Sequence, residues 1–260
     1  MLCSDIIKVI EDTYPKEAAL DFDNVGLLAG RTEKEVGCVY LALDATGPVI
    51  EDALKAGADM LITHHPLIFS PLKAVTDQDF IGKRILCLIQ NDLPYYAMHT
   101  NYDVLGMAEL SGRLMGLEEP EVLDITRVQD GKPEGIGRVG KLPVPLTLEE
   151  CSAYVRHKLK LGPVKVFGSL DLTIRRMAIS PGSGKSAVKP ALEKGADVLV
   201  TGDMGHHEGI DAWEQGLSVI DAGHYGTEYI FMEDMEKFLA RKLPGLKVVT
   251  APAMHPFQIL

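Results

Sequence analysis

The sequence predicts an α/β protein built from two related α/β lobes that face each other across a cleft. Two observations favour this class: short apolar runs alternate with amphipathic helical patterns, and one segment occurs twice in the chain. The 260 residues correspond to between one and two domains, since a domain takes about 150 residues. We expect the first lobe at residues 1–128, and a connector with the second lobe at residues 129–260, all packed as one compact unit.

The order of the elements predicts parallel strands joined by helices. The N-terminal stretch mixes charged and apolar residues as an amphipathic first helix does, unlike a signal peptide. A capping box of Thr147 and Glu150 predicts a helix that continues to about Leu159. The Gly- and Pro-rich residues 129–145 are expected to form the connector. The expected strands are 39–43, 60–63, 95–98, 177–180, 198–201 and 219–221, and the other expected helices are 49–55, 80–91, 188–194 and 229–242.

An internal repeat relates the two halves. Residues 53–63 (ALKAGADMLIT) and 191–201 (ALEKGADVLVT) agree at seven of eleven positions, where ordinary composition predicts about one. Any helix–Gly–Ala–Asp–strand unit shares part of this pattern, because glycine ends the helix and the strand must be apolar. If the lobes are true repeats, their strand ends surround one cleft, where open α/β sheets bind ligands.

Composition and charge exclude several classes of protein. Hydrophobic residues make up 46% and charged residues 24% of the chain, which is typical of globular proteins. The net charge of −11 argues against nucleic acid as a partner. No apolar run reaches the roughly 18 residues of a membrane span. The four cysteines form no CxxC pair, which favours a reducing cytoplasm over a disulfide framework or a thiolate zinc site.

Two adjacent histidines follow an apolar strand in Thr63-His64-His65-Pro66. Successive side chains of a strand point to opposite faces, so a buried strand has no use for two neighbouring imidazoles. Where the chain turns at Pro66, both rings can enter a cleft, and each can bind a different metal ion. The alternative is two histidines satisfied by hydrogen bonds in the core or at the surface.

Two further motifs pair a histidine with a carboxylate four residues later. His99 and Asp103 follow an apolar run, and an aspartate in that place indicates a ligand or a turn. Glycines flank His224, and Glu228 lies one helical turn beyond it. A glutamate can bridge two cations, although a glutamate near a helix N-terminus also interacts favourably with the helix dipole.

The second lobe does not keep the histidine pair of the first. Gly202 and Asp203 stand in its place, and His206 and His207 begin a predicted helix, where they either face a substrate or lie on the surface. The histidines outside every motif, expected to face solvent, are His157 and His255.

Two motifs only partly match nucleotide-binding and hydrolase patterns. The turn from Gly182 to Ser186 resembles the end of a P-loop, but Ile179 stands where that motif has its first glycine. The turn can still receive an anion on its backbone N–H groups, which gives one hypothesis, a nucleotide-binding module that needs no metal. No GxSxG motif surrounds a suitable serine, so a hydrolase triad is not supported.

Together the motifs supply three histidines and two carboxylates, and no sulfur: His64, His65, Asp103, His224 and Glu228. Such a set suits Zn, Fe, Mn, Co or Ni better than Ca or Mg. Five side chains are enough for two divalent transition-metal ions bridged by Glu228 and a water. A water so held has its pKa lowered toward about 7 and becomes a nucleophile.

At these residues the sequence resembles a known family. The motifs ITHHPLIF, HTNYD, TGDMGHHE and DAGHYGTE, in this order and at these separations, are similar to those of the dinuclear-metal hexameric proteins typified by YbgI, a family also called GTP cyclohydrolase I type 2. Residues 22–30 (FDNVGLLAG) resemble the family's motif near the N-terminus, so the resemblance spans nearly the whole chain.

The resemblance implies a toroidal homohexamer of two-lobed protomers, with metal sites that face an internal cavity. One ion would be held by His64, Asp103 and Glu228. The other would be held by His65, His224 and Glu228.

Two further histidines, His99 and His207, match residues that line the family's site. His206 departs from the usual wording of its motif, so its role stays open. Longer members carry an inserted middle domain, which a chain of 260 residues is expected to lack.

The leading hypothesis is a dinuclear metal-dependent hydrolase that opens the ring of a nucleotide such as GTP, or of a related N-heterocycle. His99 or His207 would serve as general acid or base, because histidine titrates near neutral pH. The alternative is a metal-binding hexameric assembly or regulatory protein without catalysis. The expected partners are a small-molecule substrate and further copies of the chain, with no membrane and no cofactor besides the metals.

Overall fold

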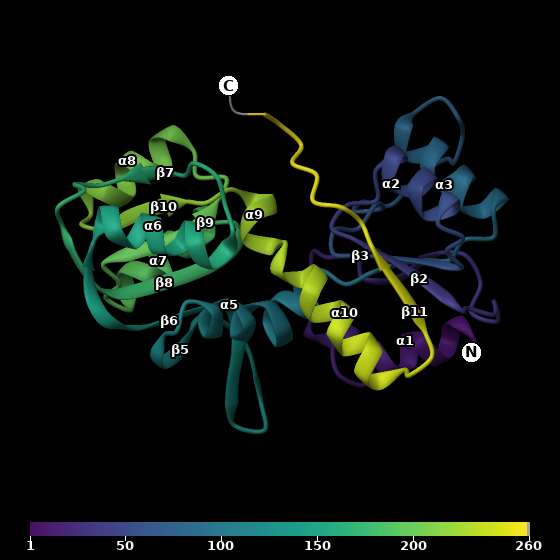
Figure 1. Cartoon of the computed structure of the whole chain (residues 1–260), viewed down its shortest axis with the longest axis horizontal. Helices are drawn as coiled ribbons and strands as arrows, with labels where there is room; N and C mark the ends of the chain where they lie inside the picture. The colour runs from purple at the N-terminus through teal and green to yellow at the C-terminus, as the bar shows by residue number, and fades with distance from the viewer. Residues whose placement is uncertain (259–260) are drawn as a thin grey trace. The chain divides into compact units, whose positions relative to one another are not determined.

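The computed structural model describes residues 1–258. They form two compact units: unit 1 comprises residues 1–102 and the described residues from 231 on, and unit 2 comprises residues 103–230. Residues 128 and 129, where the sequence suggested a division, both lie in a strand of unit 2. The predicted α/β class is confirmed, because each unit has its own sheet covered by helices (Figure 1).

Unit 1 contains a five-stranded sheet in the order β1-β4-β3-β2-β11. The strands β4, β3, β2 and β11 run parallel, and β1 is an antiparallel edge strand. The elements of this unit are α1 (Cys3–Glu11), η1 (Lys16–Ala18), β1 (Gly26–Ala29), β2 (Cys38–Ala42), α2 (Gly47–Lys55), β3 (Met60–Thr63), α3 (Phe80–Gln90), β4 (Tyr95–Ala97), α4 (Thr100–Tyr102), α10 (Ile230–Lys242) and β11 (Lys247–Thr250).

Helices cover both faces of the unit 1 sheet, which is why its central strands are continuously apolar. Every residue of β2, β3 and β4 is buried. Helices α2 and α3 lie on one face, and α1 and α10 lie on the other (Figure 1). Ile6 and Ile10 of α1 and Phe231 of α10 are fully buried. The carboxyl ends of β3 and β4 therefore emerge from a closely packed scaffold.

Unit 2 contains a six-stranded mixed sheet in the order β5-β6-β8-β9-β10-β7. Its centre, β8-β9-β10, is parallel, and the strands outside it are antiparallel to their neighbours. The elements of this unit are η2 (Asp103–Met107), α5 (Ala108–Leu114), β5 (Glu118–Gln129), β6 (Lys132–Thr147), α6 (Leu148–Leu159), β7 (Lys165–Phe167), β8 (Thr173–Ser183), η3 (Lys185–Ala187), α7 (Val188–Glu193), β9 (Val198–Gly202), α8 (His206–Glu214), β10 (Ser218–Asp221) and α9 (His224–Glu228).

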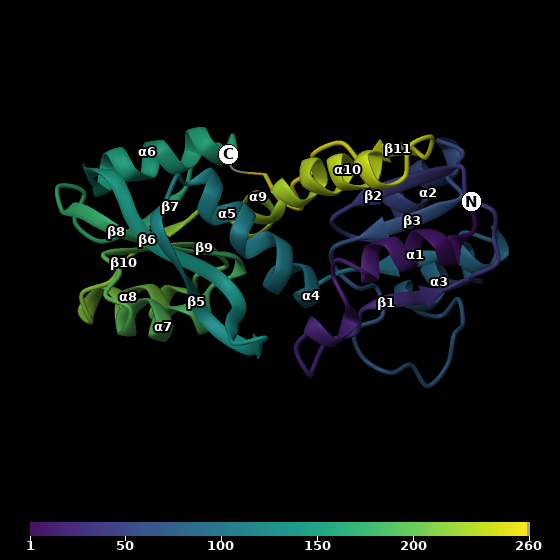
Figure 2. The ribbon, with the colours of Figure 1, turned by 90° about the horizontal axis from the view of Figure 1, so that it is seen from below.

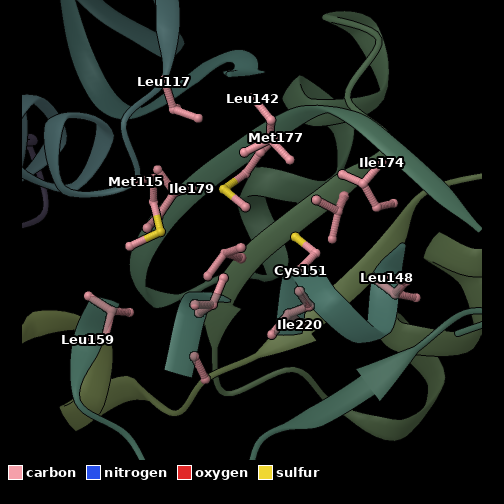
Figure 3. Packing of buried hydrophobic residues seen from close by; sticks show 14 residues of the cluster. Met115, Leu117, Leu142, Leu148, Cys151, Leu159, Ile174, Met177, Ile179 and Ile220 are labelled. Atoms are coloured by element: carbon pink, nitrogen blue, oxygen red, sulfur yellow. The ribbon is translucent and has the colours of Figure 1, made fainter. Parts of the chain in front are cut away.

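Alternate residues of the unit 2 strands enter two separate cores. Helix α6 covers one face of the sheet, and α7 and α8 cover the other (Figure 2). Cys151 of α6 packs with Met177 and Ile179 of β8 in the first core (Figure 3). Ala178, which lies between these two strand residues, belongs to the second core with Ala191 of α7. This alternation is expected of a strand with both faces covered.

The repeat predicted from the sequence has the same hydrogen bonds in both units. The N–H of Gly57 donates to Leu54 O at 3.0 Å, and the N–H of Gly195 donates to Leu192 O at 3.0 Å. The two glycines have φ values of 69° and 65°, as expected of the glycine that ends a helix.

The aspartates of the repeat are also equivalent. Asp59 Oδ2 accepts from the consecutive backbone N–H groups of Gly37 and Cys38, at 2.9 and 3.0 Å. Asp197 Oδ2 accepts in the same way from Arg175 and Arg176, at 2.7 and 2.8 Å. The shared GAD sequence therefore has one structural role in both units, which is to fix the helix end to the neighbouring strand.

Residues 129–145, expected to form a connector, belong mainly to β6, which pairs with β5 and β8. Glycines in this stretch allow close packing: a Cβ on Gly135 would lie 1.9 Å from the carbonyl oxygen of Asp124. The turn is confined to Asp130 and Gly131, which have φ values of 51° and 77°. These are the residues that a tight hairpin turn requires.

Each of the six predicted strands overlaps a strand of the structure, and the capping box at Thr147 is present. Within residues 1–258, no helix is long and apolar enough to cross a membrane.

Candidate metal centre

Unit 1 gathers three histidines beyond the ends of β3 and β4. His64, His65 and His99 each offer a ring nitrogen, and the three nitrogens lie within 4.8 Å of one another. His64 is fully buried, and the side chains of His65 and His99 are 21% and 19% exposed. The carboxyl ends of parallel strands meet at one edge of a sheet, which is why residues 35 positions apart come together.

An oxygen atom holds Nδ1 of each of these rings. Nδ1 of His64 lies 2.9 Å from the carbonyl oxygen of Met98, which can only accept, so this nitrogen carries the proton. Nδ1 of His65 lies 2.9 Å from Asp44 Oδ1, and Nδ1 of His99 lies 2.9 Å from Asp23 Oδ1. A proton on Nδ1 leaves the lone pair on Nε2. Histidines that bind metals are oriented in this way.

Asp23 is a buried carboxylate that fixes His99. Besides His99, its oxygens accept from the backbone N–H and the hydroxyl of Thr100, at 2.9 and 2.5 Å. Burial by itself would raise the pKa of Asp23, but the hydrogen bonds from His99 and Thr100 outweigh it and lower the pKa to about 2. The residue is therefore ionised near neutral pH and accepts a hydrogen bond from the Nδ1–H group of His99.

Tyr95 supports the turn that carries the histidine pair. Its hydroxyl donates to the carbonyl oxygen of His65 at 2.9 Å and accepts from the N–H of Leu67 at 2.8 Å. It also lies 2.8 Å from the hydroxyl of Thr63. Burial raises the pKa of Tyr95 to about 12, so the phenol keeps its proton. One side chain thereby connects the end of β3 to the loop after it.

Unit 2 has a donor pair of its own on the short helix α9. His224 Nε2 lies 3.0 Å from Glu228 Oε2, and the glutamate side chain is only 4% exposed. Nδ1 of His224 lies 2.7 Å from Asp203 Oδ2. The fourth candidate histidine thus has the same arrangement as the other three, with Nδ1 directed at an oxygen.

Glycines make room for this pair. A Cβ on Gly182 would lie 2.3 Å from Glu228 Oε1, and a Cβ on Gly202 would lie 2.4 Å from the backbone nitrogen of His224. The N–H of Gly182 donates to the hydroxyl of Thr227 at 3.0 Å. The loop that resembled a P-loop therefore packs against α9. The backbone donors at Gly182 and Gly184 bind within the unit.

The remaining sequence candidates lie in different settings. Asp103 is half-buried and begins η2, a π-helical turn. His206 and His207 begin α8 as predicted, and both side chains are exposed, with ring centroids 5.1 Å apart. His157 and His255 are exposed, as expected.

The sequence interpretation missed the orienting role of Asp44, Asp23 and Asp203. Asp44 follows β2 closely, and Asp203 follows β9 directly. A carboxylate just beyond a buried strand is the sequence signal that marks both Asp44 and Asp203 as candidates. Asp23 lies in a loop, and only the structure brings it to His99.

The donor set suits a divalent transition metal. Imidazole nitrogens and carboxylate oxygens are the ligands that Zn and its neighbours prefer, and a buried glutamate beside histidine is common at such sites. The hydrogen bonds to Nδ1 add the outer contacts that fix the ligands. The residues present therefore fit a metal site.

Comparison with known proteins agrees with the resemblance seen in the sequence. The protein named GTP cyclohydrolase 1 type 2 homolog in Clostridium perfringens is 34% identical over 264 residues, covering 100% of both chains. A Bacillus cereus protein related to NIF3 has a crystal structure that matches with a TM-score of 0.89 at 26% identity, covering 100% of this chain and 99% of that chain. The structure of protein ybgI has the same fold, with a TM-score of 0.82 at 22% identity, covering 99% of this chain and 100% of that chain. The chain therefore belongs to the DUF34/NIF3 family (NGG1p interacting factor 3), whose sequence profile matches residues 1–256.

Proposed function

We propose that this protein is a metal-dependent hydrolase that holds two divalent transition-metal ions. The proposed ligands are His64, His65, Asp103, His224 and Glu228. One observation carries the proposal: the three proposed histidine ligands, His64, His65 and His224, all have Nδ1 directed at an oxygen acceptor. Three histidines with the same orientation are not needed to stabilise a core, whereas histidines that bind metals almost always have it.

The bound ions would act as Lewis acids and activate water near neutral pH. The protein's own residues would then move protons. His99, with Nδ1 bound to Asp23, has Nε2 to take or give a proton. His207 is the other proposed general acid or base, and its exposed position at the start of α8 suits exchange of protons with solvent.

The proposed substrate class is a nucleotide or a related N-heterocycle. Relatives from several bacteria and one archaeon carry the name GTP cyclohydrolase 1 type 2 homolog. We therefore propose hydrolytic opening of the imidazole ring of GTP, followed by release of the ring carbon as formate. Fold and family do not fix the substrate, so GTP is the first compound to test.

The first experiment measures metal content per protomer by plasma mass spectrometry, on protein purified without chelator. The wild type should carry about two ions, and His64→Ala and Glu228→Ala should carry fewer, because each loses a proposed ligand. Glu214→Ala, which changes an exposed glutamate of α8, is the matched control and should keep the wild-type content. An empty wild type that cannot be reloaded would contradict the metal site.

The second measurement is formate release from GTP by the loaded protein. Release should occur in the wild type and fall at least about 10- to 100-fold in Glu228→Ala, because loss of a residue that only supports a metal ligand already costs that much. Release that is the same in both proteins would exclude this hydrolase activity at the proposed centre.

One structural feature favours the alternative, a metal-binding assembly protein without catalysis. Edge strand β5 carries two exposed apolar side chains, Ile125 at 51% and Val128 at 64%. Exposed edge strands with apolar residues favour association with other chains. In that case a cytoplasmic homohexamer would form with full metal content, and nucleotides would not be turned over. The formate assay separates the two functions, because a homohexamer is expected in both.

A further inference from the structure

Two exposed aromatic rings lie beside the histidines of unit 1. The side chains of Phe22 and Phe69 are 61% and 50% exposed, and their ring centroids are 6.1 Å apart. The ring of Phe69 is also 6.5 Å from that of His99, in an edge-to-face arrangement with 74° between the planes. We call these two phenylalanines the aromatic pair.

Hydrogen bonds hold the aromatic pair in place. Asp23, next to Phe22, is bound to His99 and Thr100. The following residue, Asn24, donates through Nδ2 to the carbonyl oxygen of Ile68 at 2.5 Å, next to Phe69. Three consecutive residues thus carry one ring, orient a site histidine and fasten the loop that carries the other ring. An exposed pair fixed by polar contacts is preorganised to bind a ligand.

The backbone just before Phe69 is anchored to the core of unit 1. Leu67 is buried, and its N–H donates to Tyr95 OH at 2.8 Å. Phe69 therefore begins the exposed part of the loop directly after an anchored stretch. A third exposed phenylalanine, Phe80, has the guanidinium of Arg84 over its ring, 5.0 Å from the centroid. Phe80 provides an internal control, since its face already has a cation over it.

We propose that Phe22 and Phe69 bind the planar heteroaromatic ring of the substrate and place it beside His99. The inference rests on the proposed function and assigns recognition of the substrate's flat ring to these two side chains. Aromatic side chains bind such rings by stacking, and the interaction tolerates different bases because every base has a π-face. A nitrogen heterocycle fits this place because its ring stacks on carbon while its polar edge meets the histidines.

The test compares ligands with and without a ring. Binding of GTP, ATP and inorganic tripolyphosphate to the metal-loaded protein is measured by titration calorimetry. Tripolyphosphate carries the charge of the nucleotides but no ring. The variants are Phe22→Leu/Phe69→Leu, which keeps apolar side chains at both positions, and Phe80→Leu as the matched control. Metal content is measured for each protein.

The wild type should bind GTP or ATP more tightly than tripolyphosphate. The double variant should keep its metal and bind tripolyphosphate unchanged, but bind the nucleotides at least about 10-fold more weakly, in line with the loss of stacking on aromatic rings. Phe80→Leu should match the wild type.

Three results would overturn the inference. The first is a wild type that binds the nucleotides no better than tripolyphosphate. The second is a double variant with wild-type nucleotide affinity. The third is a double variant that changes the sedimentation of the protein, since the pair would then bind a second copy of the chain. Ring-dependent binding without formate release would refute the hydrolase and leave the inference standing. Formate release with unchanged kcat/KM in the double variant would refute the inference and support the hydrolase.

Discussion

The same eleven-residue segment leads to different chemistry in the two units. Residues 53–63 and 191–201 end in equivalent threonines, Thr63 and Thr201, at the carboxyl end of a parallel strand. In unit 1 the next residues are His64 and His65, which supply donor nitrogens. In unit 2 the next residue is Gly202, which supplies room for the backbone of His224.

The equivalent threonines, Thr63 and Thr201, also have different hydrogen-bond partners in the two units. The hydroxyl of Thr63 donates to the carbonyl oxygen of His65 at 2.7 Å and so supports the histidine turn. The hydroxyl of Thr201 donates to the carbonyl oxygen of Gly182, near the end of β8, at 3.4 Å. One strand end therefore positions the proposed ligands directly, whereas the other packs against the end of β8 that lies next to Glu228. A repeat can keep its scaffold while the residues just beyond each strand diverge.

The largest effect should follow from filling the space in unit 2. In Gly202→Ala, the added Cβ would lie 2.4 Å from the nitrogen and 2.6 Å from the Cα of His224. These are backbone atoms, so α9 must shift, and we expect a loss of about 3 kcal/mol in the free energy of unfolding. Urea denaturation measures the change.

The control for this variant is Gly162→Ala, where a Cβ would meet nothing within 4 Å. It should alter the free energy of unfolding by about 0.5 kcal/mol or less. A Gly202→Ala protein as stable as this control would mean that α9 is not fixed by close contact, and the contrast between the strand ends would weaken.

The second prediction tests whether the orienting aspartates are equivalent across the units. Asp44 holds His65, and Asp203 holds His224, and their side chains are 47% and 58% exposed. Asp44→Ala and Asp203→Ala should each weaken metal affinity about 10- to 100-fold, because the ring loses its fixed orientation. Competition with a chromophoric chelator measures the affinity.

Neither substitution should much change the free energy of unfolding, since both carboxylates are half exposed. Asp77→Ala, in an exposed loop position, is the control and should leave metal affinity unchanged. If only Asp44→Ala loses affinity, then His224 is not a ligand of the bound metal.

Much of the fold could be predicted because its signals are local. The predicted strand at residues 60–63 has the same bounds as β3, since a short apolar run bounded by turns is typical of a buried strand. The hairpin of β5 and β6 was missed, although Asp130 and Gly131 form a common hairpin turn. The many glycines of β6 indicated turns, but their role is to let neighbouring strands approach, and that depends on the tertiary structure.

The candidate site divides in the same way. His64, His65, His224 and Glu228 were found because histidines and carboxylates at strand ends stand out in the sequence. The carboxylates that hold Nδ1 of His99 and His65 could not be predicted, because they are distant in the sequence. Asp23 is 76 residues from His99, and Asp44 is 21 residues from His65. Hydrogen bonds over such separations depend on how the sheet is ordered, which no local pattern records.

The smallest expected effect concerns the hydroxyl groups behind the two strand ends. Tyr95→Phe removes a donor to His65 O and an acceptor for the N–H of Leu67, both at distances below 3 Å and within a buried environment. We expect a loss of about 1–2 kcal/mol in the free energy of unfolding. The partner variant in unit 2, Thr201→Val, loses only a long contact of 3.4 Å and should cost about 0.5 kcal/mol or less. Equal losses in the two variants would show that the threonine of unit 2 contributes as much as the tyrosine of unit 1, and that the strand ends differ in their ligands but not in how firmly they are held.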